Sequence, residues 1–111
     1  MNQLPCPAMD WVRARFEHEE MELPDQLAFA LASYNAGYGH VSDARQVAEL
    51  MGLDRNRWFE NVELAMLRLS DPEVYRTVPH GYSRGSEPVN YVRQIMDLAT
   101  LYFRVTEDQG R

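Results

Sequence analysis

The 111-residue chain has a single cysteine, Cys6, and lacks long apolar runs. One cysteine excludes an internal disulfide and a cysteine-based metal cluster, and no other metal set or cofactor motif is expected. No stretch approaches the roughly 18 consecutive apolar residues of a membrane-spanning helix. The first residues also lack the basic start and apolar centre of an export signal. We therefore expect a chain with no transmembrane segment, no metal and no cofactor.

An excess of basic charge is also missing. The net charge is −6, because 17 acidic residues outnumber 11 basic ones, and all of the basic residues are arginine. Residues 1–40 carry a net −4 (six acids, two bases), and residues 41–111 carry −2 (eleven acids, nine bases). An acidic chain provides no electrostatic footprint for phosphate backbones or anionic lipids, so we expect no nucleic-acid partner.

Apolar residues recur at helical intervals in five stretches, and no pair of stretches alternates as paired strands do. The predicted fold class is therefore all-α, with about five helices. We expect a loose leader over residues 1–8, one folded unit over 9–105 and a frayed tail over 106–111. The predicted apolar faces are Met9, Val12 and Phe16; Leu27, Ala30, Leu31 and Tyr34; Val47, Leu50 and Met51; Trp58, Val62, Ala65 and Leu69; and Tyr91, Ile95, Leu98 and Tyr102.

Turn-forming residues mark the expected boundaries between these helices. Gly37 and Gly39 predict a helix end followed by a turn, Ser42 a cap for the third helix and Gly52 its stop. Residues 71–88 hold three prolines and two glycines. Long connections of this kind often form part of a functional site.

Several candidate chemical sites have simpler explanations. His18 and Glu22 have the four-residue spacing of zinc proteases, but a carboxylate stands where the second histidine is needed. The cluster Glu17, Glu19, Glu20 and Glu22 is expected to be a solvated acidic surface. His40 and His80 are predicted to make structural hydrogen bonds, and Cys6 has no base near it in the sequence.

A helix-turn-helix pattern is also visible around Ala48 and Gly52, with Arg55, Asn56 and Arg57 at the expected start of a second helix. That is where a recognition helix contacts DNA bases. The flanking residues are acidic and leave few cations for phosphate contacts. A helical hairpin with a glycine joint is therefore the preferred interpretation, and a small DNA-binding regulator is the weaker alternative.

Two short motifs resemble those of the lytic transglycosylases, lysozyme-like enzymes that cleave peptidoglycan. "SYNAG" (33–37) resembles their Ala-Tyr-Asn-Ala-Gly motif, and "EPVNYV" (87–92) resembles Glu-Thr-x-x-Tyr-Val with proline in place of threonine. The extended stretches "YNAGYGHVSDAR" and "GYSRGSEPVNYV" most resemble the catalytic domain of the membrane-bound F branch. The resemblance runs from about Trp11 to Val105 and includes Trp58.

The resemblance implies a lysozyme-like fold and substrate-binding roles for five residues. Tyr34 would stack on a sugar or hydrogen-bond it, Asn35 would orient the N-acetyl group, and Gly37 would allow close backbone approach. Tyr91 would lie near the catalytic glutamate, and Glu87 would support the wall behind it. Without the resemblance, packing on apolar faces would be the preferred reading of Tyr34 and Tyr91.

The chain departs from the family pattern in its first part. It contains neither the Glu-Ser pair that carries the family's catalytic acid nor the Gly-Leu-Met-Gln-like segment that follows it. We therefore expect the C-terminal half of a catalytic domain with no catalytic residue of its own, inactive alone and prone to self-association through exposed apolar faces. The resemblance implies peptidoglycan as partner and a periplasmic or outer-membrane location. The alternative is a non-catalytic helical interaction protein.

Overall fold

The computed structural model describes residues 21–109, except for the side chains of Phe103 and residues 107–109. Over this range every regular element is helical, which confirms the all-α prediction. The predicted helix over residues 9–20 lies outside the described part. The elements are α2 (Leu23–Ala36), α3 (Tyr38–Leu50), the kinked turn η1 (Trp58–Val62), α4 (Glu63–Arg68), α5 (Pro72–Tyr75) and α6 (Ser86–Gln109).

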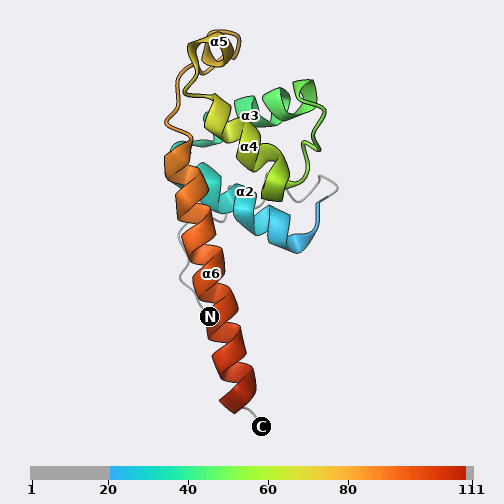
Figure 1. Ribbon diagram of the computed structural model, residues 1–111, viewed down its shortest axis with the longest axis vertical. Coiled ribbons are helices and arrows are strands. Elements are labelled where there is room, and N and C mark those ends of the chain that lie inside the picture. Colours follow the sequence, from blue (N-terminus) through green and yellow to red (C-terminus); the bar gives the residue numbers. More distant parts are fainter. Residues whose placement is uncertain (1–20, 110–111) are drawn as a thin grey trace, which may run out of the picture.

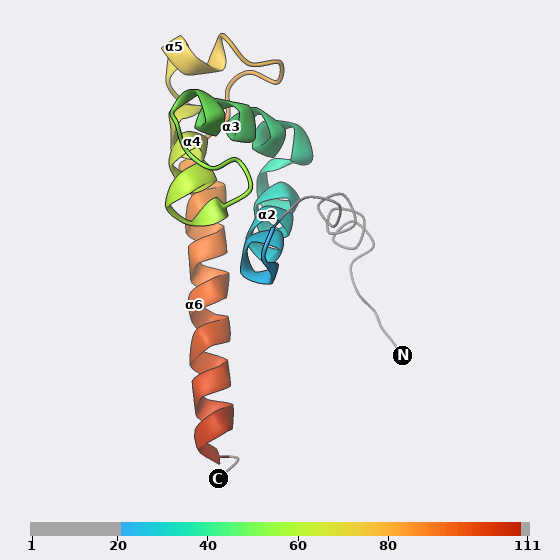
Figure 2. The same ribbon diagram turned by 90° about the vertical axis from the view of Figure 1, so that its right-hand side faces the viewer.

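Helices α2, α3 and α4 form a small body, and α6 runs along one side of it (Figure 1). The first half of α6 packs against α2 and α4, while its second half extends well beyond the body in both views (Figure 2). This extension explains the elongated dimensions of 52 × 26 × 24 Å. No helix among the described residues is both long and apolar enough to cross a membrane.

The core is built around Trp58, as its helical spacing with Val62, Ala65 and Leu69 predicted. All four side chains are fully buried. The indole meets the ring of Phe29 edge-on, with centroids 5.7 Å apart. Such aromatic pairs add about 1 kcal/mol beyond the apolar area that they bury. The predicted buried residues are therefore confirmed, but the predicted continuous helix is not, because Phe59 and Glu60 have non-helical backbone angles.

The predicted face of α2 is only partly correct: Ala30 is buried, and the half-buried Leu31 packs against the core. Leu27 and Tyr34 are exposed, at 37% and 54%, whereas Ala28, Phe29 and Ala32 are fully buried. The run from Leu27 to Ala32 is apolar at every position, so periodicity does not distinguish one face from the other. Small alanines on the buried side let α2 approach its neighbours closely, and this packing selects the face.

Helix α3 begins five residues earlier than a cap at Ser42 implies. It starts at Tyr38, directly after Gly37, so Gly39 and Ser42 lie inside the helix and Ser42 is no cap. Gly37 has φ = 101°, a conformation that only glycine adopts readily, and this allows one residue to join two helices. The predicted stop at Gly52 agrees with α3 ending at Leu50 and with its φ of 78°.

The predicted apolar stripe of α3 is only partly correct. Val47 is buried, but Leu50 and Met51 are 85% and 39% exposed. The buried positions are Val41, Asp43, Ala44, Arg45, Val47 and Ala48. Two of them carry formal charge, and burial of a charge requires hydrogen-bonding partners that the helix itself does not supply. The loops that supply these partners decide which face of α3 is inside.

The predicted face of α6 is also wrong in its outer half. Leu98 and Tyr102 are 63% and 66% exposed, and Tyr91 and Ile95 are half-buried. The side chains in the core are Pro88, Val89 and Val92. Helix α6 is apolar over a broad arc, and the body covers only one edge of that arc.

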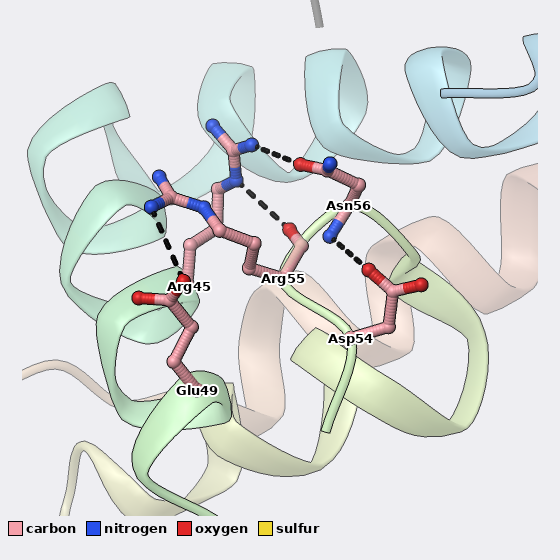
Figure 3. Close-up of polar contacts among 5 residues, drawn as sticks. All are labelled: Arg45, Glu49, Asp54, Arg55 and Asn56. Atoms are coloured by element: carbon pink, nitrogen blue, oxygen red, sulfur yellow. Dashed lines mark hydrogen bonds and ion pairs between the residues drawn. The ribbon is translucent and has the colours of Figure 1, made fainter. Parts of the chain in front are cut away.

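The link over residues 51–57 is fastened to α3 by Arg45 (Figure 3). The guanidinium donates to the backbone oxygen of Arg55 (2.9 Å) and to Oδ1 of Asn56 (2.6 Å), and lies over the Phe29 ring. The link ends where the N–H of Trp58 donates to the buried carboxylate of Asp25 at 2.9 Å.

This arrangement corrects the helix-turn-helix pattern. Arg55, Asn56 and Arg57 precede the next helix instead of opening it, since Phe59 and Glu60 after them have non-helical backbone angles. The side chain of Asn56 is occupied by Arg45, and Arg55 pairs with Glu49 at 3.6 Å. These residues therefore do not form the first turn of a recognition helix.

Candidate functional site

A cavity of about 270 Å³ opens where α2 ends, α3 begins and α6 starts. The connection over residues 76–85 forms its remaining wall. The lining residues are Asn35, Ala36, His40, Tyr82, Ser83, Arg84, Glu87 and Pro88. The volume is close to the lower limit of small-molecule sites, which run from about 300 to 1,000 Å³.

The α2–α3 wall follows from the one-residue joint at Gly37. Because the joint is so short, the last turn of α2 and the first turn of α3 border the same space. Asn35 thereby comes close to His40 across the joint. The Nδ1 atom of His40 is buried and has no hydrogen-bond partner among the described residues.

The connection is held on α3 at His80. The fully buried carboxylate of Asp43 accepts the backbone N–H of His80 at 2.9 Å and contacts ring Nδ1 at 3.0 Å. The imidazole lies over Gly39, where an added Cβ would come within 2.6 Å of the ring. This close approach explains why glycine stands inside α3 at a position of ordinary helical conformation.

The same connection is held on α4 at its other end. The N–H of Ser83 donates to the backbone oxygen of Leu69 at 3.1 Å. A Cβ at Gly85 would lie 1.8 Å from the backbone oxygen of Met66, so only glycine fits there. The intervening residues 81–84 are therefore placed from both sides.

The mouth of the cavity carries one cation and one carboxylate. Arg84 pairs with Glu87 at 3.4 Å, and both side chains are exposed. The pKa of Arg84 is raised above its ordinary value, first by hydrogen bonding to Tyr82 and then by Glu87. Tyr82 also meets Tyr75 edge-on at 5.6 Å. Opposite charges that neutralise each other, with an amide, a hydroxyl and an imidazole nearby, suit a neutral polar ligand.

The structure brings two of the five predicted site residues together. Asn35 and Glu87 both line the cavity, although 52 positions separate them in the sequence (87 − 35). Tyr34 is exposed, Tyr91 is half-buried one turn beyond Glu87, and Gly37 forms the joint. These three do not line the cavity, and the substrate-binding role of all five stays a prediction.

Sequence reasoning missed most of the connection and one histidine. The sequence predicts a structural hydrogen bond for His40 and no particular role for Tyr82, Ser83 or Arg84, whereas all four line the cavity. The glycine- and proline-rich composition of residues 71–88 predicts that this connection forms part of a site. It does not predict which side chains of the connection line that site. Among residues 21–109 no three metal-ligating side chains converge, and Cys6, His18 and most of the acidic cluster lie outside this range.

No protein-family model matches the sequence. Individual curated proteins do match it at high identity. The chain is 50% identical over 78 residues to "Membrane-bound lytic murein transglycosylase F" of Maricaulis maris, which covers 70% of this chain and 17% of that protein. The same name is carried by a relative from Stutzerimonas stutzeri (44% over 91 residues; 82% and 18%). A form numbered F 1, from Alkalilimnicola ehrlichii, is 44% identical over 93 residues (84% and 19%).

The chain thus spans less than a fifth of the length of these relatives. The similarity nevertheless covers most of its own length, at 40–50% identity in several proteins of one name. This chain is therefore a homologue of one part of the membrane-bound lytic murein transglycosylase F proteins and belongs to the lytic transglycosylase family.

Proposed function

We propose that this chain forms one side of a peptidoglycan-binding groove. The family reaction is non-hydrolytic cleavage of the β-1,4 bond between N-acetylmuramic acid and N-acetylglucosamine, which leaves a 1,6-anhydro ring. The observation that carries the proposal is that Asn35 and Glu87, one from each family-like motif, line the same cavity. The proposed place of action is the periplasm or the outer membrane.

The chemistry of the cavity supports an N-acetylated sugar as ligand. An acetamido group presents one N–H and one carbonyl oxygen, and the Asn35 amide can both accept and donate. The exposed rings of Tyr34 and Tyr82 offer apolar faces for sugar rings, and their hydroxyls can hydrogen-bond. Tyr34, Gly37 and Tyr91 would act beside the cavity instead of inside it.

We further propose that the chain binds glycan without cleaving it. Family catalysis uses one glutamate as acid and then as base, and the 111 residues contain no Glu-Ser pair. The carboxylate at the cavity, Glu87, is exposed and paired with Arg84. A general acid at neutral pH needs burial that favours its protonated form, and Glu87 lacks it.

Titration with a chitooligosaccharide, followed by tryptophan and tyrosine fluorescence, tests the binding. The wild type should show a saturable change, and Asn35→Ala should weaken binding about tenfold through loss of hydrogen bonds to the acetamido group. Asn90→Ala, an exposed asparagine on α6, is the matched control and should bind as wild type does. Absence of saturation in the wild type would reject the proposal.

Incubation with purified peptidoglycan tests the lack of cleavage separately. We expect no anhydro-muropeptides above background from the wild type. Turnover that disappears in Glu87→Gln would instead make Glu87 a catalytic acid and overturn this part of the proposal.

One observation favours a second role, as a helical interaction module that self-associates. Ile95, Leu98, Tyr102 and Val105 on α6 follow the three- and four-residue spacing of a helix-pairing seam, and the last three are exposed. The outer half of α6 extends away from the body, so a second copy could pair with it along this seam (Figure 1). Sedimentation at increasing concentration should then show a dimer, and a monomer throughout would reject this role.

A further inference from the structure

Asp43 is a charged residue in a fully buried position. Its side chain is 1% exposed, in the middle of α3. Burial of an ionised carboxylate is costly unless hydrogen-bond donors replace the lost water. Within the described part of the chain, both of its hydrogen-bond contacts are with His80, 37 residues further along. Asp43 is therefore placed to bind one residue of a distant connection.

The two contacts define how His80 is held. The backbone N–H of His80 donates to Oδ2 of Asp43, and ring Nδ1 of His80 contacts Oδ1, so the carboxylate binds this residue through two contacts. An ionised carboxylate only accepts hydrogen bonds, so Nδ1 carries the proton. His80 is therefore either the neutral Nδ1–H tautomer or the imidazolium, and both forms retain the contact between Nδ1 and Asp43.

The held imidazole also meets the cavity wall. It lies against Gly39 on one side, and its centroid is 6.3 Å from that of His40, with the rings inclined at 70°. His40 lines the cavity, whereas His80 does not. His80 thus borders His40 directly and, through the chain, places Tyr82 two residues later.

We propose that Asp43 is a positioning residue for the cavity. It acts through His80 to set the connection over residues 76–85 and the ring of His40, and so shapes the wall that the ligand meets. The anchor at Ser83 and Gly85 holds only the end that leads into α6. The inference rests on the proposed function for the nature of the ligand, but its structural part stands independently.

The test compares Asp43→Asn with Asp97→Asn, the same change on an exposed part of α6. Asparagine keeps the shape but offers one acceptor oxygen and one donor nitrogen, so if its oxygen accepts the backbone N–H of His80, its nitrogen faces Nδ1 and cannot accept the proton carried there. In wild type and Asp97→Asn, ¹⁵N spectra of the imidazoles should show His80 protonated at Nδ1. In Asp43→Asn, this signature should be lost and amide exchange at residues 78–83 should become at least about tenfold faster.

A general loss of stability would act differently. It would accelerate exchange throughout the core, including the N–H of Val62, which is bonded to the backbone oxygen of Arg57. Uniform acceleration, or unchanged His80 signals in Asp43→Asn, overturns the inference. If Asp43→Asn does not fold, His80→Ala serves instead, because its side chain is 53% exposed. It should accelerate exchange over the same residues, and unchanged exchange overturns the inference.

Binding of the chitooligosaccharide supplies the second readout. Asp43→Asn should bind about tenfold more weakly than wild type, while Asp97→Asn should be unaffected. Equal affinity despite a loosened connection overturns the positioning role. If the wild type binds no sugar, the proposed function fails, and the imidazole and exchange data still decide whether Asp43 sets this wall.

Discussion

Two loops of this molecule are fastened by two charged residues of the same helix, with different results. Arg45 donates to the backbone oxygen of Arg55 in the link over residues 51–57. Asp43, two positions earlier on α3, accepts the backbone N–H of His80 in the connection over residues 76–85. A cation thus binds a carbonyl in one loop, and an anion binds an amide in the other.

The loops differ in what their remaining side chains do. In the link, Asn56 accepts from Arg45, and Asp54 accepts the N–H of Asn56, so polar groups close on one another (Figure 3). In the connection, Asp43 binds His80 and the backbone oxygen of Leu69 accepts the N–H of Ser83, while Tyr82 and Arg84 line the cavity. A loop that uses its polar groups internally is structural, whereas one held at its ends can present side chains to a ligand.

The largest expected effect is at the second anchor of the connection. Gly85→Ala places a Cβ 1.8 Å from the backbone oxygen of Met66. This obstructing atom belongs to the backbone, so it cannot move aside as a flexible side chain would. We expect a loss of about 3 kcal/mol in the free energy of unfolding, measured with urea. Gly52→Ala in the link is the control, since its Cβ meets nothing within 4 Å and only the positive φ is strained, at about 1 kcal/mol. Equal losses would contradict the difference in packing.

Arg45→Met should lower the free energy of unfolding by about 2 kcal/mol, because the backbone oxygen of Arg55 and the side chain of Asn56 lose a charged donor. Sugar affinity should stay unchanged, because the link does not border the cavity. Urea unfolding and the fluorescence titration measure the two effects. Arg68→Met, at a half-exposed arginine, should change neither. Weaker sugar binding by Arg45→Met would show that the two loops are not independent.

Gly39→Ala should have a smaller effect on stability, about 1 kcal/mol, because the obstructing atoms belong to the half-exposed ring of His80 and can swing away. Hydrogen exchange should quicken in the connection and stay constant in the link. Quicker exchange in both loops would mean that α3 itself had moved.

Leu98→Gln should have the smallest effect on stability, within about 0.5 kcal/mol, because the side chain is 63% exposed. It should lower self-association, which sedimentation velocity measures. Thr100→Gln, on an exposed position of the same helix, is the control and should leave association unchanged. If Leu98→Gln still dimerises as wild type does, α6 is not the dimer interface.

Helical spacing correctly predicts that Trp58, Val62, Ala65 and Leu69 are buried, although the exposed Leu64 and Leu67 lie between them. The same reasoning predicts only part of the buried faces of α2 and α6. Apolar residues occupy more than one face of these helices, and the neighbouring elements determine which of them are covered. For the site, the two family-like motifs predict that Asn35 and Glu87 belong to one binding site. Motif spacing alone does not predict which side chains line the cavity.

The sequence by itself determined the helical class, the stop at Gly52 and the central place of Trp58, because these depend on local spacing and on glycine's conformational freedom. It also determined membership of the lytic transglycosylase family. Only the tertiary structure determined that the ring of His80 packs against Gly39 and that His80 contacts the carboxylate of Asp43. That contact joins residues 37 positions apart, and local periodicity carries no information about such a distance. The buried charge of Asp43 needed donors from outside its helix, and folding alone brought them there.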